Sequence, residues 1–114
     1  GDTSRDFCYV DNAIQINILA AMSSNEESIN QVYNVALNDR TSLNELYKMI
    51  QAKLAERVQG LKKKEPIYRD FRAGDVRHSQ ASIEKAKKLL NYKPKYKISD
   101  GLDEALGWYI NSAS

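Results

Sequence analysis

The spacing of apolar residues along the chain predicts its first two helices. After Asp11, apolar side chains recur every four residues and define one face of a helix: Ile14, Ile18 and Met22. Ser42 and Glu45 form an S-x-x-E capping box, in which each side chain binds the free backbone N–H of the other residue. The apolar residues that follow keep helical spacing until Gly60 ends this second helix: Leu43, Leu46, Tyr47, Ile50 and Leu54.

Two further helices are predicted in the last third of the chain. Ser82 can cap a helix with an apolar inward face: Ile83, Ala86, Leu89 and Leu90. Asn91 suits the left-handed position after this helix, and Pro94 prevents its continuation. Ser99 or Asp100 caps the last helix, which has another apolar face: Leu102, Ala105, Leu106, Tyr109 and Ile110.

Three short segments rich in aromatic and β-branched residues predict strands at residues 7–10, 32–35 and 67–71, with a turn at Ala73 and Gly74. The predicted fold class is therefore α/β, with about three short strands and four helices. Each strand is too short for an independent sheet, so the helices keep apolar faces without a partner. The polar start at residues 1–4, without an initiator Met, also favours a fragment of a larger protein.

The composition restricts the class of protein. The 114 residues suit one domain, and 42% hydrophobic with 28% charged residues allow a folded core. A net charge of +2 is too small for the dense basic face of a nucleic-acid or membrane-surface protein. The single cysteine, Cys8, excludes an internal disulfide and fits a reducing cytoplasm. No apolar run approaches the roughly 20 residues that span a bilayer.

Two clusters of arginine and aspartate are candidate anion sites. One is Arg5 with Asp6, before the first predicted strand, and the other lies around Gly74 in residues 69–79. A guanidinium fork binds two phosphate oxygens at once, and a glycine lets the backbone approach a ligand. The alternative is a network of surface ion pairs. The sequence contains no general acid/base pair, Ser-His-Asp set or metal cluster.

The other chemically notable residues favour structural roles. We interpret Cys8 as a buried apolar thiol in a strand, and Trp108 and Tyr109 as core residues. His78, the only histidine in the sequence, is interpreted as a surface or supporting side chain. The lysines at 62–64 have no interleaved aromatic residues, which indicates a solvated face rather than a nucleic-acid patch.

Five segments, in order, resemble the extended short-chain dehydrogenase/reductase family. SRDFCYVDN from residue 4 is similar to its (S/T)RDFxYVxD segment, and YNVA from residue 33 with TSLNEL from residue 41 is similar to the next strand and helix. RAGDVRHS from residue 72 resembles the family's R-x-G-D loop, IEKAKKLLNYKP from residue 83 resembles KAxxxLGYxP, and the last helix resembles GLxxxxxWY. Asn91 stands where the family often has Gly, and the loop at 1–4 is shorter than the usual GDGxTS.

Within this family, RDFCYVDN and GDVRHSQA are most similar to the UDP-N-acetylglucosamine 4-epimerases of bacterial surface-polysaccharide and O-antigen synthesis. The resemblance implies that Arg5 and Arg72 bind the pyrophosphate of a UDP-sugar and that Asp75 binds the uridine ribose. It also implies that Ser79 lines the sugar pocket, where a small side chain leaves room for an N-acetyl group. From the residues alone, Ser79 can also be a cap near the helix that starts at Ser82.

The resemblance further implies a parent enzyme with a catalytic half that residues 1–114 lack. Such epimerases carry a GxxGxxG site for NAD and a catalytic Tyr-x-x-x-Lys pair, and neither occurs here. Residues 1–114 would be the C-terminal region that holds a UDP-N-acetylhexosamine against an N-terminal Rossmann half, in a cytoplasmic, homodimeric parent. The alternatives are a UDP-uronic acid epimerase, a 4,6-dehydratase or a decarboxylase, and an independent small interaction module.

Overall fold

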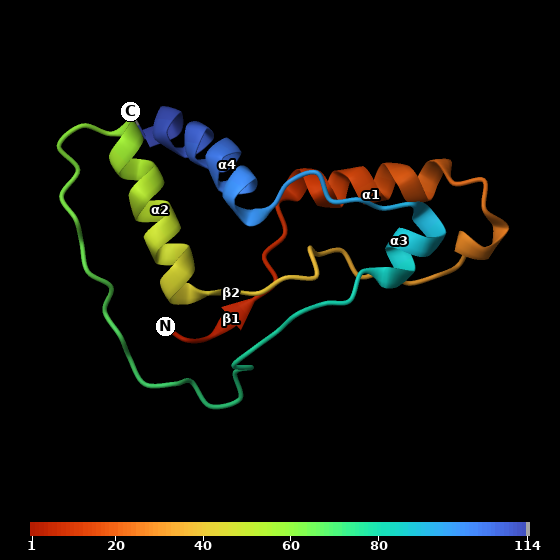
Figure 1. The fold of residues 1–114 in the computed structure, drawn as a ribbon, viewed down its shortest axis with the longest axis horizontal. Coiled ribbons are helices and arrows are strands. Elements are labelled where there is room, and N and C mark those ends of the chain that lie inside the picture. The colour runs from red at the N-terminus through yellow and green to blue at the C-terminus, as the bar shows by residue number, and fades with distance from the viewer. Residues whose placement is uncertain (114) are drawn as a thin grey trace.

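The computed structural model describes residues 1–113, which form four α-helices and a two-stranded sheet (Figure 1). In chain order the elements are β1 (Ser4–Arg5), α1 (Val10–Met22), the 3-10 helix η1 (Glu26–Ser28), β2 (Thr41–Ser42), α2 (Leu43–Arg57), α3 (Glu84–Leu90) and α4 (Ile98–Ala113). The strands pair antiparallel, with Ser4 opposite Ser42. The predicted α/β class with four helices is confirmed. None of these helices is long and apolar enough to cross a membrane.

The molecule is a thin plate rather than a ball. Its principal extents are 54 × 36 × 17 Å, and a helix with its side chains is already about 10–12 Å across. The radius of gyration is 17.2 Å, whereas a compact domain of this length has about 13 Å. Figure 1 shows α2 beside α4 at one end and α1 beside α3 at the other, with β1 and β2 between them. In a plate this thin, few apolar side chains can be buried from both faces of the molecule.

The hydrophobic core lies at the α1 and α3 end. Its buried members come from helices and loops distant in sequence: Ile16, Ala36, Ile83, Ala86, Leu90 and Tyr92. Tyr92 is fully buried and its hydroxyl donates to the carbonyl of Ala36 at 3.2 Å. Burial raises the pKa of Tyr92 to about 12. The phenol therefore stays neutral and serves as a hydrogen-bond donor inside the core.

Ion pairs connect α2 to α4 at the other end of the plate. Lys53 and Arg57 donate to the Asp103 carboxylate at 2.8 and 3.0 Å, and Arg57 also donates to the Asp103 carbonyl at 2.9 Å. The hydrogen bond from Lys53 is the main cause that lowers the pKa of Asp103. Because a lowered pKa reflects a carboxylate preferred in the folded state, this contribution to stability is lost as pH falls through that pKa.

The helix signals at residues 42–45 and at Asn91 are confirmed, whereas the predicted cap of the third helix by Ser82 is wrong, because Ile83 is the N-cap of α3 and no side chain caps it. The capping box is formed: Ser42 Oγ accepts from the Glu45 amide at 3.1 Å, and Glu45 Oε2 accepts from the Ser42 amide at 2.8 Å. Asn91 is left-handed, with φ of 57°. However, α2 ends at Arg57, before Gly60, and α4 begins at Ile98. Asp100 therefore lies inside α4 and accepts from the Lys97 amide, at 3.1 Å, instead of capping the helix from outside.

The predicted strand positions are wrong. Residues 7–9 form a loop that leads into α1, of which Val10 is the first residue, and residues 32–35 and 67–71 carry no strand pairing. The strand pairing that does form is between the polar residues of β1 and β2, with Ser4 opposite Ser42 and Arg5 opposite Thr41. A segment with high strand propensity forms a strand only where a neighbouring strand pairs with it. Among the described residues, no strand lies beside these three apolar segments. Cys8 is accordingly half-buried in a loop rather than in a strand.

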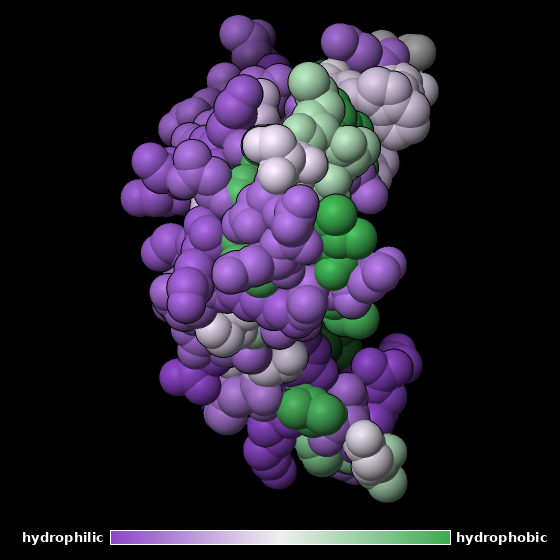
Figure 2. Space-filling model, turned by 90° about the vertical axis from the view of Figure 1, so that its right-hand side faces the viewer, coloured by the Kyte–Doolittle hydropathy of each residue, from purple (hydrophilic) through white to green (hydrophobic). Residues whose placement is uncertain are grey.

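The apolar face predicted for α1 is exposed rather than inward. Ile14, Ile18 and Met22 are 50%, 53% and 80% exposed, and together with the exposed Val10 they form what we call the α1 stripe. The opposite side of α1 enters the core through Ile16. Figure 2 shows hydrophobic residues reaching the surface in a broken band among hydrophilic ones.

The prediction that Trp108 and Tyr109 are core residues is wrong, because both are exposed on α4. Periodicity identifies the apolar face of a helix but cannot show what covers it. The lysines at 62–64 are exposed, as predicted.

Candidate functional site

Backbone hydrogen bonds bring together the two arginine–aspartate clusters that the sequence singled out. β1 is bridged in parallel to His78, with the Ser4 amide donating to the Arg77 carbonyl at 2.8 Å and the Ser79 amide donating to the Ser4 carbonyl at 3.1 Å. The loop that carries Arg72 is thereby held beside the strand that carries Arg5.

Asp75 is the point where the two predicted phosphate-binding arginines meet. Arg5 Nη2 lies 3.1 Å from Asp75 Oδ1, and Arg72 Nη2 lies 3.3 Å from Asp75 Oδ2. A turn makes the second contact possible: Gly74 has a φ of 82°, and the Asp75 amide donates to the Arg72 carbonyl at 3.2 Å. With two positive charges and one negative charge, this trio keeps a net charge of +1. It can therefore attract an anion.

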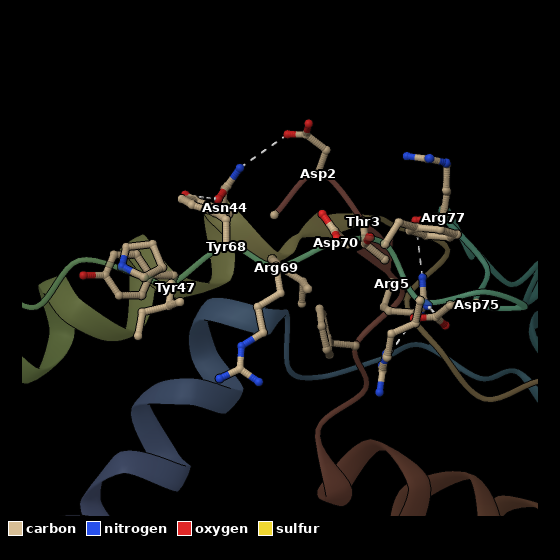
Figure 3. A pocket seen from close by; sticks show the side chains of 17 residues that line it. Asp2, Thr3, Arg5, Asn44, Tyr47, Tyr68, Arg69, Asp70, Asp75 and Arg77 are labelled. Carbon is tan, nitrogen blue, oxygen red and sulfur yellow. Dashed lines mark hydrogen bonds and ion pairs between the residues drawn. The ribbon is translucent and has the colours of Figure 1, made fainter.

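These residues line an elongated cavity of about 540 Å³, which is large enough for a small ligand. Figure 3 shows Tyr47, Asn44 and Tyr68 at one end, and Arg5, Asp75 and Arg77 at the other. Tyr68 donates its hydroxyl to the Asn44 side chain at 2.8 Å. The guanidinium of Arg77 stacks over the Phe71 ring, 4.3 Å from its centroid. Cations and aromatic groups thus share one hollow between the N-terminus, α2 and the loop at 66–77.

Ser79, the fourth predicted site residue, lies outside this cavity. Its side chain is exposed, and its amide is used in the bridge to Ser4. Ser79 is not the N-cap of α3 either, because that position is held by Ile83. The neighbouring His78 is exposed, and its Nδ1 is 2.8 Å from the hydroxyl of the buried Ser4. His78 therefore supports the strand bridge, which agrees with its predicted supporting role.

Asp6 is a residue of the cluster whose role sequence reasoning missed. Its Oδ1 accepts from the Leu37 amide at 3.0 Å, and its Oδ2 accepts from the amides of Asp39 and Ala81 at 3.2 and 3.3 Å. One carboxylate thus holds two distant loops beside Arg5. The sequence placed Asp6 next to Arg5 and before an apolar segment, which was the available signal for its role. The sequence does not show which backbone amides the Asp6 carboxylate would bind.

Cys8 is unsuited to nucleophilic chemistry. Burial raises the pKa of its thiol, and the nearby Asp6 carboxylate acts in the same direction. The thiolate is the reactive form, so a raised pKa disfavours reaction. Among residues 1–113, no group of three or more His, Cys, Asp or Glu side chains is arranged to hold a metal ion.

The chain matches a family described as GDP-mannose 4,6 dehydratase over residues 1–105, and it belongs to that family. It is also similar to solved nucleotide-sugar epimerases. A UDP-glucose 4-epimerase from Thermotoga maritima, solved with UDP-glucose, is 30% identical with a TM-score of 0.85, and the match covers 100% of this chain and 34% of that one. A UDP-N-acetylglucosamine 4-epimerase from Methanobrevibacter ruminantium M1, in complex with UDP-N-acetylmuramic acid, is 34% identical with a TM-score of 0.82. This match covers 98% of this chain and 33% of that one.

A third similar structure contains the cofactor. It is the UDP-glucuronic acid 4-epimerase from Bacillus cereus in complex with UDP-glucuronic acid and NAD, which is 27% identical with a TM-score of 0.81, over 100% of this chain and 34% of that one. The chain spans about a third of the length of the curated relatives it matches, and it corresponds to a C-terminal part of them. The predicted resemblance to nucleotide-sugar epimerases is confirmed.

Proposed function

We propose that residues 1–114 are the UDP-sugar-binding portion of a UDP-N-acetylglucosamine/UDP-N-acetylgalactosamine 4-epimerase. The observation that carries this proposal is the convergence of Arg5 and Arg72, which are far apart in the sequence, on Asp75, and all three residues line one cavity. Guanidinium pairs of this kind suit a diphosphate, because each fork can engage two oxygens. The likeness to a UDP-N-acetylglucosamine 4-epimerase supports the choice of substrate.

In this proposal the chain binds and orients the substrate. Arg5 and Arg72 hold the pyrophosphate, and Asp75 accepts from a ribose hydroxyl while it keeps both guanidinium groups in place. Positioning of this kind lowers a barrier because the entropy of alignment is lost on binding rather than in the reaction. The sugar is then presented to groups outside residues 1–114.

NAD does not fit the residues of this chain. A pyrophosphate-binding glycine loop opens the N-terminus of a helix, whereas the two glycines with positive φ, Gly60 and Gly74, stand singly in loops. The sequence also has no Tyr-x-x-x-Lys pair. When bound elsewhere in the parent enzyme, NAD would supply the transient oxidation at C4, and we assign no residue of this chain to that step.

We further propose that the missing half is an N-terminal Rossmann domain that covers the α1 stripe. The thin shape and the exposed apolar faces support this proposal, since such surfaces are normally buried against another part of a protein. The N-acetyl preference rests on the likeness to the UDP-N-acetylglucosamine enzyme and on Ser79, whose small, exposed side chain lies beside the strand that carries Arg5.

A UDP-glucuronic acid 4-epimerase is a second candidate function. It is favoured by the similarity to the Bacillus cereus enzyme, although that structure is less identical than the N-acetylglucosamine enzyme, at 27% against 34%. An assay of the complete enzyme with UDP-N-acetylglucosamine, UDP-glucose and UDP-glucuronic acid separates the two functions. The proposal expects the highest kcat/KM for UDP-N-acetylglucosamine.

The Ser79→Tyr variant tests the pocket assignment within the same assay. A bulky ring should fill the space of the N-acetyl group, and overpacking a formed site costs about 1–3 kcal/mol, which corresponds to a loss of roughly tenfold to hundredfold in kcat/KM for UDP-N-acetylglucosamine. UDP-glucose, which has only a hydroxyl at that position, should be affected far less. Equal losses for both substrates, or none, would contradict a role for Ser79 in sugar choice.

A further inference from the structure

One arginine of the cavity has no partner among the residues that the structure describes. Four arginines line the cavity: Arg5, Arg69, Arg72 and Arg77. Three of them are held, since Arg5 and Arg72 pair with Asp75, and Arg77 stacks over Phe71. Within residues 1–113, Arg69 is in no hydrogen bond, ion pair or ring contact. Its full positive charge is therefore available to a ligand.

The adjacent aspartate does not neutralise Arg69. Residues 67–71 form a loop without helix or strand, and the side chains of Arg69 and Asp70 leave it on opposite sides (Figure 3). In Figure 3, Asp70 points toward the side of Asp2, whereas Arg69 points the other way, toward the side of α4. A ligand on the Arg69 side of the loop would meet the guanidinium without its neighbouring carboxylate.

The charge of the trio of Arg5, Arg72 and Asp75 shows what Arg69 would add. Arg5, Arg72 and Asp75 together carry +1, and Arg69 raises the sum to +2. A diphosphate esterified at both ends carries roughly two negative charges at neutral pH, and guanidinium groups are its preferred partners. With Arg69 included, these four side chains carry the charge that balances a diphosphate.

We propose that Arg69 is a third phosphate-binding side chain of this cavity, and this inference rests on the proposed UDP-sugar function. Arg69 would approach the diphosphate from the loop at 67–71, whereas Arg5 approaches from β1 and Arg72 from the turn before Asp75. The three guanidinium groups would then surround the diphosphate from three separate segments. Because Arg69 would contact the phosphate groups and not the sugar, it should not distinguish one sugar from another.

The test compares the binding of UDP and uridine to the complete enzyme by calorimetry. Arg69→Ala should weaken UDP binding about tenfold or more, the effect of losing a charge-assisted hydrogen bond, and should leave uridine binding unchanged because uridine has no phosphate. Arg69→Lys, which keeps the charge, should recover part of the loss. Arg40→Ala is the matched control, since Arg40 is exposed outside the cavity and its loss changes net charge equally.

Two kinds of failure are distinguishable. If the wild-type enzyme binds no UDP, the proposed function and this inference are both overturned. If the wild type binds UDP and Arg69→Ala binds it equally well, or weakens uridine by the same factor, the proposed function stands and the phosphate role of Arg69 is overturned. A loss of UDP binding in Arg40→Ala as large as in Arg69→Ala would also overturn it, because the effect would then be one of net charge.

Discussion

Asn12 is a polar residue in the interior, and it fixes the loop between α3 and α4. The side chain is fully buried, and its Nδ2 donates to the Tyr96 carbonyl at 2.7 Å. Its Oδ1 accepts from the amides of Lys95 and Tyr96 at 3.0 and 3.1 Å. One amide group thus satisfies three backbone groups. Asp6 acts in the same way beside Arg5, so single buried or half-buried polar residues determine where the loops of this molecule lie.

Asn12→Ala should loosen this loop, because three backbone groups lose their partner. An unsatisfied buried group costs about 1–3 kcal/mol, so the amides of Lys95 and Tyr96 should exchange hydrogen at least about tenfold faster than in the wild type. Asn17→Ala is the control on the same helix, since Asn17 is exposed and bonds only within its own turn. Unchanged exchange at Lys95 and Tyr96 in the Asn12 variant would contradict the assignment.

At the scale of elements, the approach of α4 to the loop before α1 depends on a glycine. Gly101 is buried in the first turn of α4, and a Cβ added there would lie 2.7 Å from Tyr9 Cβ and 2.9 Å from Tyr9 Cγ. Tyr9 in turn meets the edge of Tyr96, with ring centroids 5.0 Å apart. The absence of a side chain at Gly101 therefore lets α4 lie against this aromatic pair.

Two glycine-to-alanine variants in α4 should have opposite effects on thermal stability. Gly101→Ala should lower the free energy of unfolding by about 1–3 kcal/mol, the range for overpacking. Gly107→Ala should raise it by up to about 1 kcal/mol, because nothing lies within 4 Å of the added Cβ and alanine is the better helix former. Thermal unfolding of the complete enzyme, followed by circular dichroism, measures both changes, and shifts of the same sign would contradict the described contact of α4 with Tyr9.

The same elements show what the sequence could and could not predict. The capping box of α2 and the left-handed Asn91 were predicted because a few neighbouring residues decide them. The three strands and the inward face of α1 were predicted wrongly, because strand pairing and helix burial depend on surfaces that are distant in sequence or outside this chain. For the candidate site, the resemblance predicted Arg5, Arg72 and Asp75, and the structure brings these three side chains together. Spacing alone could not have shown that residues so far apart in the sequence meet.

At the scale of the whole molecule, the plate has too little interior for its apolar content. The α1 stripe, Trp108 and Tyr109 are exposed on a molecule only 17 Å thick along its shortest axis. The isolated chain should therefore be marginally stable or self-associated, because exposed apolar area is a driving force for association. Replacement of Ile14 and Ile18 by lysine should reduce the self-association, which sedimentation velocity would measure.

A different result would contradict this account of the plate. If the isolated wild-type chain is a clean monomer that melts cooperatively at about 45–65 °C, the range typical of mesophile domains, it needs no covering partner. A monomer that melts without a cooperative transition agrees with the account, as does an oligomer that the lysine replacements dissociate.

The most direct test of the central claim is the affinity of the complete enzyme for UDP with and without Arg72. Arg72 is 87% exposed, so its removal should leave the fold intact. If the trio of Arg5, Arg72 and Asp75 binds the diphosphate, calorimetry should show that Arg72→Ala weakens UDP binding by about 1.5–3 kcal/mol. A dissociation constant equal to that of the wild type would contradict the claim and would leave the trio as a network of surface ion pairs.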